Sequence, residues 1–193
     1  MSTVIIKYNA GNIQSVLFAL ERIGETAVVT DDVMQIQQAG KVIFPGVGEA
    51  SSAMKYLQQR GLDRVIRELT QPVLGICLGM QLLCRHSEEN DTGCLGIFDT
   101  QVKKFRDTLK VPQMGWNSIS RLSGPLFSGV EEESYCYFVH SYYAELSPYT
   151  IATTEYGIPF SSALAKDNFY GVQFHTEKSA ATGEQILKNF LSL

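Results

Sequence analysis

The stretch Gly75-Ile76-Cys77-Leu78-Gly79 constrains the fold most, because it sets a cysteine between two glycines at the end of an apolar run. The run before Cys77 is typical of a buried strand, and the apolar spacing from Leu78 to Arg85 is typical of a helix. A chain that turns from strand to helix over one residue crowds its own backbone, and glycines two positions before and after relieve that crowding. The pattern therefore predicts a nucleophile elbow with Cys77 at the turn.

A cysteine at such a turn is suited to nucleophilic attack. At the head of a helix it meets the positive end of the helix dipole and unpaired backbone N–H groups, which favour the thiolate over the thiol. The alternative is a buried structural cysteine, since free cysteines are among the most buried residues in proteins. Cys77 is thus a candidate nucleophile, with packing as the competing interpretation.

Length and composition indicate one globular domain over residues 1–193, with 45% hydrophobic residues. A net charge of -4 and the lack of a basic run interleaved with aromatics argue against a nucleic-acid partner. No apolar stretch approaches the roughly 20 residues that span a bilayer, and the first residues lack the features of a signal peptide. We expect no membrane association and a cytoplasmic location.

The cysteines do not form a metal or redox motif. No two of them stand at Cys-x-x-Cys spacing, and all are expected to be reduced thiols: Cys77, Cys84, Cys94 and Cys136. We therefore expect no metal and no cofactor, and we assign the last three cysteines to packing.

In the first half of the chain, short apolar segments alternate with amphipathic ones. The predicted strands lie at 4–6, 27–29, 42–44 and up to residue 76. The predicted helices lie at 12–23, after Asp31-Asp32, at 50–60, at 62–69 and from residue 78. This alternation predicts an α/β fold with a central, mostly parallel sheet and helices on both faces.

The second half changes character. After a polar loop expected at 88–93, short strand candidates follow at 102–105, 118–122, 137–139, 150–154, 161–165 and 170–174. Short antiparallel strands, in hairpins or at a mixed sheet edge, are predicted there. A final helix at 183–193 carries its apolar residues on one face.

A cysteine nucleophile needs a base, and the chain has three histidines. His175 is the best candidate, because it follows the last predicted strand, whose end shares a rim of the sheet with Cys77. Glu177 can fold back onto the imidazole and fix its tautomer, which predicts a Cys-His-Glu triad. His86, at the polar end of a helix, is interpreted as a surface residue. His140 is interpreted either as a base or as a core or loop-anchoring residue.

The tetrahedral intermediate of such a reaction needs backbone donors for its oxyanion. The Leu78 N–H at the helix start is one candidate, and the loop Pro45-Gly46-Val47-Gly48 can bring a second. The competing interpretation of this loop is a dinucleotide-binding turn. It has little support, because Ser51 stands where the third glycine belongs.

Three motifs together resemble the class I, triad glutamine amidotransferases over almost the whole chain. They stand in the family's order: Pro45-Gly46-Val47-Gly48, Gly75-Ile76-Cys77-Leu78-Gly79-Met80-Gln81 and Gly171-Val172-Gln173-Phe174-His175-Thr176-Glu177. The resemblance implies a flavodoxin-like fold and the hydrolysis of glutamine to glutamate and ammonia. It also implies that Cys77 attacks the carboxamide, that His175 transfers protons and that Glu177 orients His175. The N–H groups of Val47 and Leu78 are implied as the oxyanion hole.

Within that class the chain resembles the glutaminase subunits of imidazole glycerol phosphate synthases. The supporting segments lie at 8–12, 111–117, 137–143 and 177–179, and Met114-Gly115-Trp116-Asn117, expected in a loop, is the most specific. Lys7 and Thr176 depart from the residues of many relatives. The resemblance implies histidine biosynthesis and a heterodimer, in which an ammonia channel leads to a (β/α)8-barrel cyclase subunit. The cyclase then makes imidazole glycerol phosphate and aminoimidazole carboxamide ribotide.

The resemblance also assigns a substrate pocket and a partner face. The positions that resemble glutamine-binding residues are Gly46, Gly48, Gln81, Ser141 and Tyr142. The positions that map to the cyclase-facing surface are Asn12, Met114, Trp116, Asn117, Tyr137 and Lys178. Plainer interpretations exist: Asn12 as a helix cap, Met114 and Trp116 as core, and Tyr137 and Lys178 as solvated surface residues.

Three other functions compete with this interpretation. A glutaminase of another pathway, such as pyridoxal phosphate synthesis, is disfavoured by the segment 114–117. A non-catalytic homologue that only binds a partner is disfavoured by the complete set of triad residues. A cysteine hydrolase or chaperone with a similar elbow has no need of a glutamine pocket.

Overall fold

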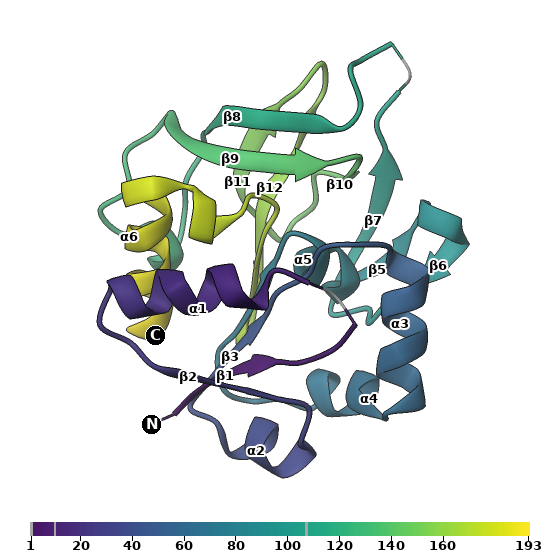
Figure 1. Ribbon diagram of the computed structural model, residues 1–193. Coiled ribbons are helices and arrows are strands. Elements are labelled where there is room, and N and C mark those ends of the chain that lie inside the picture. The colour runs from purple at the N-terminus through teal and green to yellow at the C-terminus, as the bar shows by residue number, and fades with distance from the viewer. Residues whose placement is uncertain (1, 10, 107) are drawn as a thin grey trace.

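The computed structural model describes residues 2–9, 11–106 and 108–193 (Figure 1). Ala10, which belongs to the resembling segment 8–12, lies outside the described residues. The first half confirms the predicted alternation of strands and helices. Its elements are β1 (Thr3–Ile6), α1 (Ile13–Arg22), β2 (Ala27–Thr30), α2 (Val33–Gln38), β3 (Lys41–Phe44), α3 (Ala50–Gln59), α4 (Leu62–Arg67), β4 (Val73–Ile76) and α5 (Leu78–Leu83).

The central strands are buried on both faces, between two hydrophobic cores. In β1, Val4 and Ile6 pack into one core and Ile5 into the other. Helices α2 to α5 contribute to the first core, and α1 with the last helix, α6 (Ala180–Leu191), to the second (Figure 1). Strands covered on both sides are continuously apolar, which explains why the sequence predicted them well. None of the helices in the described part of the chain is long and apolar enough to cross a membrane.

The second half consists mainly of short strands, as predicted. Its elements before α6 are β5 (Cys84–Ser87), η1 (Glu89–Asp91), β6 (Thr92–Gly93), β7 (Phe98–Lys104), β8 (Gln113–Ile119), η2 (Pro125–Phe127), β9 (Ser134–His140), β10 (Tyr142–Ala144), β11 (Thr150–Glu155), β12 (Pro159–Lys166), β13 (Phe169–Val172) and η3 (Thr176–Lys178). Most pairings here are antiparallel, and β8 and β9 form a separate two-stranded sheet.

Several local predictions were wrong. The helix after Cys77 ends at Leu83, so Arg85 and His86 lie in β5, which pairs in parallel with β7. The expected loop at 88–93 contains η1 and β6. The segment 114–117 is not a loop but the middle of β8, paired with β9. Strands β5 and β8 pair with β7 and β9, which lie further along the chain, and the two-residue β6 pairs with the neighbouring β5, so the local pattern alone does not reveal these strands.

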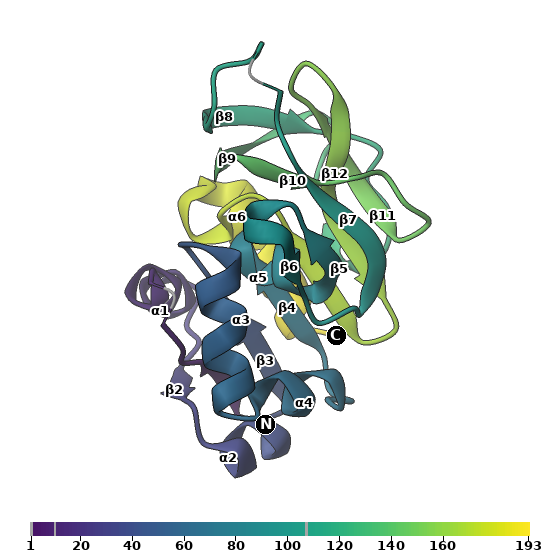
Figure 2. The ribbon, with the colours of Figure 1, turned by 90° about the vertical axis from the view of Figure 1, so that its right-hand side faces the viewer.

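Strand β13 joins the two halves of the main sheet. It lies between β4 and β12, parallel to the first and antiparallel to the second. The register of Val172 with Ile76 places the residues that follow β13 and β4 at the same rim of the sheet. The β8–β9 sheet lies at this end of the molecule, and α2 lies at the opposite end (Figure 2).

Candidate active site

Cys77 occupies the one-residue turn between β4 and α5. Its backbone has φ 54° and ψ -110°, a conformation that is strained for a residue with a Cβ. A Cβ on Gly79 would lie 1.8 Å from the Phe44 carbonyl oxygen. A Cβ on Gly75 would lie 2.8 Å from backbone atoms of α5. The crowding predicted for the elbow is thereby confirmed, and both glycines are needed for the turn.

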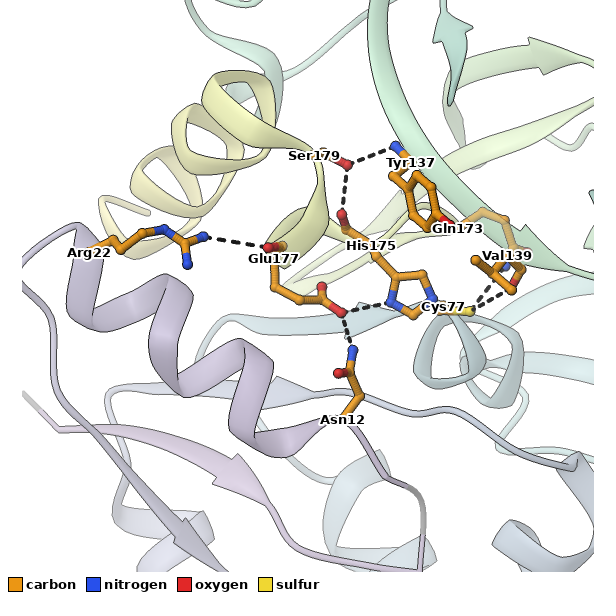
Figure 3. A network of polar contacts seen from close by, with 9 residues as sticks. All are labelled: Asn12, Arg22, Cys77, Tyr137, Val139, Gln173, His175, Glu177 and Ser179. Atoms are coloured by element: carbon orange, nitrogen blue, oxygen red, sulfur yellow. Dashed lines mark hydrogen bonds and ion pairs between the residues drawn. The ribbon is translucent and has the colours of Figure 1, made fainter. Parts of the chain in front are cut away.

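The side chains of His175 and Glu177 meet Cys77 at this rim (Figure 3). His175 follows β13, and Glu177 lies in the short helix η3. His175 Nδ1 lies 2.7 Å from Glu177 Oε1, and both side chains are buried. The imidazole lies between the Glu177 carboxylate and the Cys77 sulfur (Figure 3). The structure thus brings together the three residues predicted as a triad.

The charge state of His175 follows from these neighbours. Burial lowers its pKa, but hydrogen bonds to Cys77 and Glu177, together with their negative charges, outweigh burial and raise the pKa to about 10. The imidazole is therefore protonated at neutral pH, and Nδ1–H donates to Glu177. A protonated histidine beside a cysteine favours the nucleophilic thiolate.

Asn12, predicted for the cyclase-facing surface, points its amide at the triad. Asn12 Nδ2 donates to the same Glu177 oxygen that His175 contacts. Asn12 does occupy the N-cap position of α1, but within the described part of the chain its side chain makes no capping hydrogen bond to that helix. Arg22 Nη2 lies 3.5 Å from the Glu177 carbonyl oxygen (Figure 3). Helix α1 therefore contributes to the surroundings of the triad.

A cavity of about 330 Å³ opens beside Cys77. Its lining includes the predicted residues Val47, Gly48, Leu78, Gln81, Ser141, Tyr142, His175 and Lys178. Gly46, predicted to bind glutamine, is not among the residues that line the cavity, and its carbonyl oxygen accepts from the Leu78 N–H. Sequence reasoning missed three lining residues, Glu89, Pro112 and Val139, and it did not place His140, which also lines the cavity, in the substrate pocket. A volume of this size suits a small molecule.

Glu89 supplies a carboxylate to the cavity. Its Oε2 accepts a hydrogen bond from the Ala50 N–H at 2.8 Å, at the start of α3. Burial raises the pKa of Glu89, and the Ala50 hydrogen bond opposes that rise. A carboxylate in this place is suited to a ligand ammonium group. No sequence pattern distinguishes Glu89, because it stands in a polar stretch where solvated glutamates are common.

The predicted oxyanion hole is not assembled in this structure. The Leu78 N–H donates to the Gly46 carbonyl oxygen at 3.3 Å, so one expected donor is already engaged. A flip of the Gly46–Val47 peptide would remove this carbonyl and turn the Val47 N–H inward. The oxyanion hole of Val47 and Leu78 therefore stays a prediction, because a sequence does not show the resting orientation of a peptide group.

Comparison with known proteins now decides the family. The family described as "Glutamine amidotransferase class-I" matches residues 4–193. The chain belongs to this family. The amidotransferase is 58% identical to the "Imidazole glycerol phosphate synthase subunit HisH" of Bacteroides fragilis (strain YCH46), with 100% of each chain covered. It is 49% identical to the protein of that name from Idiomarina loihiensis, covering 100% of this chain and 98% of the relative.

Solved structures confirm the fold of the amidotransferase. A structure described as "glutamine amidotransferase" matches with a TM-score of 0.76 at 17% identity, covering 98% of this chain and 97% of the other. "PurLQS from Thermotoga maritima" matches with a TM-score of 0.74 at 14% identity, covering 99% and 97%. At such identities the likeness concerns the fold alone, and it confirms the predicted α/β architecture.

The other histidines of the amidotransferase are engaged by their neighbours. His140 Nδ1 lies 2.7 Å from the Tyr142 carbonyl oxygen, and Nε2 lies 2.8 Å from the Gln113 side-chain amide. Burial lowers the pKa of His140 to about 4, so the ring is neutral near pH 7. His140 is buried and its partners lie on β8 and β10, which agrees with the core interpretation rather than with a base. His86 contacts Asp91 at 2.8 Å and is partly exposed.

The remaining cysteines are buried free thiols: Cys84, Cys94 and Cys136. Burial raises the pKa of Cys94 and of Cys136 to about 12, so these thiols stay protonated at neutral pH. The packing role expected for them agrees with this burial. Over residues 2–9, 11–106 and 108–193, no three His, Cys, Asp or Glu side chains are grouped to hold a metal ion.

Three predicted partner residues form one surface beside the cavity, here termed the aromatic ridge: Trp116, Tyr137 and Lys178. Trp116 and Tyr137 are paired across β8 and β9, with ring centroids 5.8 Å apart. Lys178 Nζ lies 5.9 Å from the centre of the Tyr137 ring. Trp116 is 53% exposed and Met114 is 65% exposed, so the core interpretation of both is wrong. Asn117 instead donates to the Glu155 carbonyl oxygen at 3.0 Å.

The aromatic ridge is tied to the triad through backbone hydrogen bonds. The His175 N–H donates to the Tyr137 carbonyl oxygen at 2.9 Å. The Tyr137 N–H donates to the Ser179 hydroxyl at 3.0 Å, and this hydroxyl donates to the His175 carbonyl oxygen at 2.6 Å (Figure 3). Strand β9 at Tyr137 is therefore hydrogen-bonded to the backbone of His175 both directly and through Ser179.

Proposed function

We propose that this amidotransferase is the glutaminase subunit of an imidazole glycerol phosphate synthase in histidine biosynthesis. It hydrolyses glutamine to glutamate and ammonia, and it delivers the ammonia to a (β/α)8-barrel cyclase subunit. The observation that carries the proposal is the position of Cys77, on a strained elbow beside the paired His175 and Glu177 at a small-molecule cavity. The full-length similarity to HisH proteins supports the pathway.

In the first half-reaction, the Cys77 thiolate attacks the side-chain carboxamide carbon of glutamine. A carbon–sulfur bond forms, and the carbonyl electron pair moves to oxygen. The protonated His175 gives its proton to the amide nitrogen as the carbon–nitrogen bond breaks. Ammonia leaves, and a glutamyl thioester remains on Cys77. Glu177 holds the imidazole in place throughout, through Nδ1.

In the second half-reaction, the neutral His175 acts as a base. It takes a proton from a water molecule, whose oxygen attacks the thioester carbon. The carbon–sulfur bond then breaks, and Cys77 leaves as a thiolate beside the reprotonated His175. One glutamine and one water have become ammonia and a new carboxylic acid group, which releases its proton to solvent to give glutamate, and the triad has returned to its starting state.

The cavity supports recognition of the amino-acid end of glutamine. Glu89 is proposed to pair with the α-ammonium group, and its position is fixed by the Ala50 N–H. Gly48, Ser141 and Tyr142 line the same cavity and offer backbone groups. Lys178, a member of the aromatic ridge, also lines this cavity, so the ridge reaches the proposed substrate site.

The aromatic ridge is the proposed docking face for the cyclase. Exposed Trp and Tyr side chains are typical of the centre of protein interfaces. A closed junction is required, because ammonia released into neutral water mostly becomes ammonium, which is not nucleophilic. A partner that contacts Tyr137 would touch a residue that is hydrogen-bonded to His175. The Leu78 N–H of the oxyanion hole is engaged by Gly46 in the isolated chain. We therefore propose that the partner gates catalysis. The cytoplasmic location stays a prediction.

The deciding experiment is glutamate release from glutamine by the purified chain, alone and with a histidine-pathway cyclase and its nucleotide substrate. We expect a large increase when both are added, and no glutamate from Cys77→Ala in any mixture. Cys136→Ala is the matched control, since Cys136 is buried away from the cavity lining. Activity that ignores the cyclase would point to another acceptor pathway. Full activity of Cys77→Ala would overturn the triad.

A further inference from the structure

Gln173 is a buried polar residue that the proposed chemistry leaves without a role. It follows β13, stands two residues before His175, and has no exposed surface. Its Nε2 lies 3.7 Å from the Cys77 sulfur. Figure 3 shows Gln173 and Val139 reaching the sulfur from one side and His175 from the other. A buried amide with a contact to the nucleophile calls for an explanation.

The orientation of the Gln173 amide is fixed by its neighbours. The Tyr142 carbonyl oxygen can only accept, so the Gln81 side chain must turn its nitrogen toward it, at 2.9 Å. The same nitrogen has a second hydrogen, which points to Gln173 Oε1 at 2.9 Å. With its oxygen held by Gln81, Gln173 must turn its nitrogen toward Cys77. The chain of hydrogen bonds therefore runs from the Tyr142 carbonyl oxygen, which accepts from Gln81, through the Gln81 and Gln173 amides to the sulfur.

We propose that Gln173 is a further catalytic residue, whose amide N–H donates to the Cys77 thiolate, and that Gln81 is the positioning residue that aims this amide. The contribution to glutamine hydrolysis rests on the proposed function, whereas the contact to the thiolate does not.

The surroundings of the sulfur give this contact a direction. The Val139 carbonyl oxygen, 3.8 Å from the sulfur, can only accept, so it favours the protonated thiol. Gln173 and the protonated His175 are donors, so they favour the thiolate. Gln173 keeps its donor when His175 has given its proton to the leaving ammonia. When the thiolate departs from the thioester, Gln173 therefore donates to it in addition to the reprotonated His175.

The test is the pH dependence of Cys77 alkylation by iodoacetamide in the full chain, followed on the peptide that contains Cys77. Gln173→Met keeps the length of the side chain and removes the donor. We expect its alkylation rate at pH 7 to fall about 3- to 10-fold, with the profile moved to higher pH. Gln81→Met should produce a smaller change in the same direction, because the Gln173 amide is then free to rotate.

Ser162→Ala is the matched control. The Ser162 carbonyl oxygen accepts from the backbone N–H of Gln173 at 2.9 Å, so Ser162 lies next to Gln173. Its buried hydroxyl has no hydrogen-bond partner among the residues described, so the substitution removes no bond and should leave alkylation unchanged. A role in packing alone would leave the pH profile of Gln173→Met where the parent has it.

Folded Gln173→Met that is alkylated like the parent at every pH would overturn the proposal. Should Gln173→Met fail to fold, an unchanged profile of Gln81→Met would overturn it instead. Glutamate release is measured in parallel with the cyclase present. Shifted alkylation together with a parent that releases no glutamate would leave the Gln173 contact standing and would remove the proposed function.

Discussion

The charge on His175 depends on two neighbours, Cys77 and Glu177. Burial lowers the pKa of His175, and these neighbours raise it to about 10, so the proton is lost only in strongly alkaline solution. Glu177→Gln removes one negative charge and therefore lowers this pKa. We expect kcat/KM for glutamine at neutral pH to fall about 100-fold, and the alkaline limb of its pH profile to move to lower pH.

The control for this prediction is Glu184→Gln, which removes a glutamate that pairs with Arg22 at 3.2 Å on the surface. Its pH profile should match that of the parent. An alkaline limb that stays in place in Glu177→Gln would show that Glu177 does not set the charge of His175.

His140 makes the stability of the folded chain fall as the pH decreases. Its pKa is about 4 in the folded chain, below the value near 6.5 of an exposed histidine, because burial disfavours the charged ring. Between these values only the unfolded chain binds the proton, so stability is complete above about pH 6.5 and falls as the pH decreases toward 4. Urea unfolding should show that this residue lowers the free energy of unfolding by about 2 kcal/mol between pH 7 and pH 5. His140→Gln should lose correspondingly less over this interval, and an equal loss in both proteins would contradict the assignment.

The loop after β3 is the element on which the oxyanion hole depends. Gly46 lies in a tight space, where an added Cβ would meet the Tyr8 hydroxyl at 2.2 Å and the Leu78 Cβ at 3.1 Å. Gly46→Ala should therefore hinder the flip of the Gly46–Val47 peptide. We expect kcat to fall at least about 10-fold with a smaller change in KM.

Tyr8 provides the matched background for this measurement. Tyr8→Phe removes the hydroxyl that the new Cβ would meet, although it also removes the hydrogen bond to the Pro45 carbonyl oxygen. The fold decrease in kcat caused by Gly46→Ala should be smaller in the Tyr8→Phe background than in the parent. A change confined to KM would count against the peptide flip.

The elements that the sequence predicted well are those with local causes. The strands and helices up to α5 follow from apolar periodicity, and the elbow follows from Gly75 and Gly79. Strands β5 and β8 were missed because their formation depends on pairing with β7 and β9. The contacts of Asn12 and Gln173 were missed for the same reason, since each joins elements that are far apart in the sequence.

The whole molecule brings two functions to one end. The insertion of β13 beside β4 places the triad at the rim, and the β8–β9 sheet places the aromatic ridge at the same end (Figure 2). Neither half of the chain holds a complete site, because Cys77 comes from the first and His175 from the second. The order of the triad residues is visible in the sequence. The position of the aromatic ridge beside the triad is visible only in the fold.

This adjacency leads to a prediction for assembly. Trp116 is exposed, lies against Tyr137, and is the largest side chain of the aromatic ridge. Trp116→Ala should raise the Kd for the cyclase about 10-fold or more, because tryptophans buried in an interface dominate its binding energy. Isothermal titration calorimetry measures this Kd. Met34→Ala is the matched control: Met34 is 59% exposed, but it lies on α2 at the opposite end of the molecule, so its Kd should equal that of the parent. Equal binding by Trp116→Ala and the parent would show that the docking face lies away from the aromatic ridge. It would also contradict the proposed effect of the partner on His175 through Tyr137.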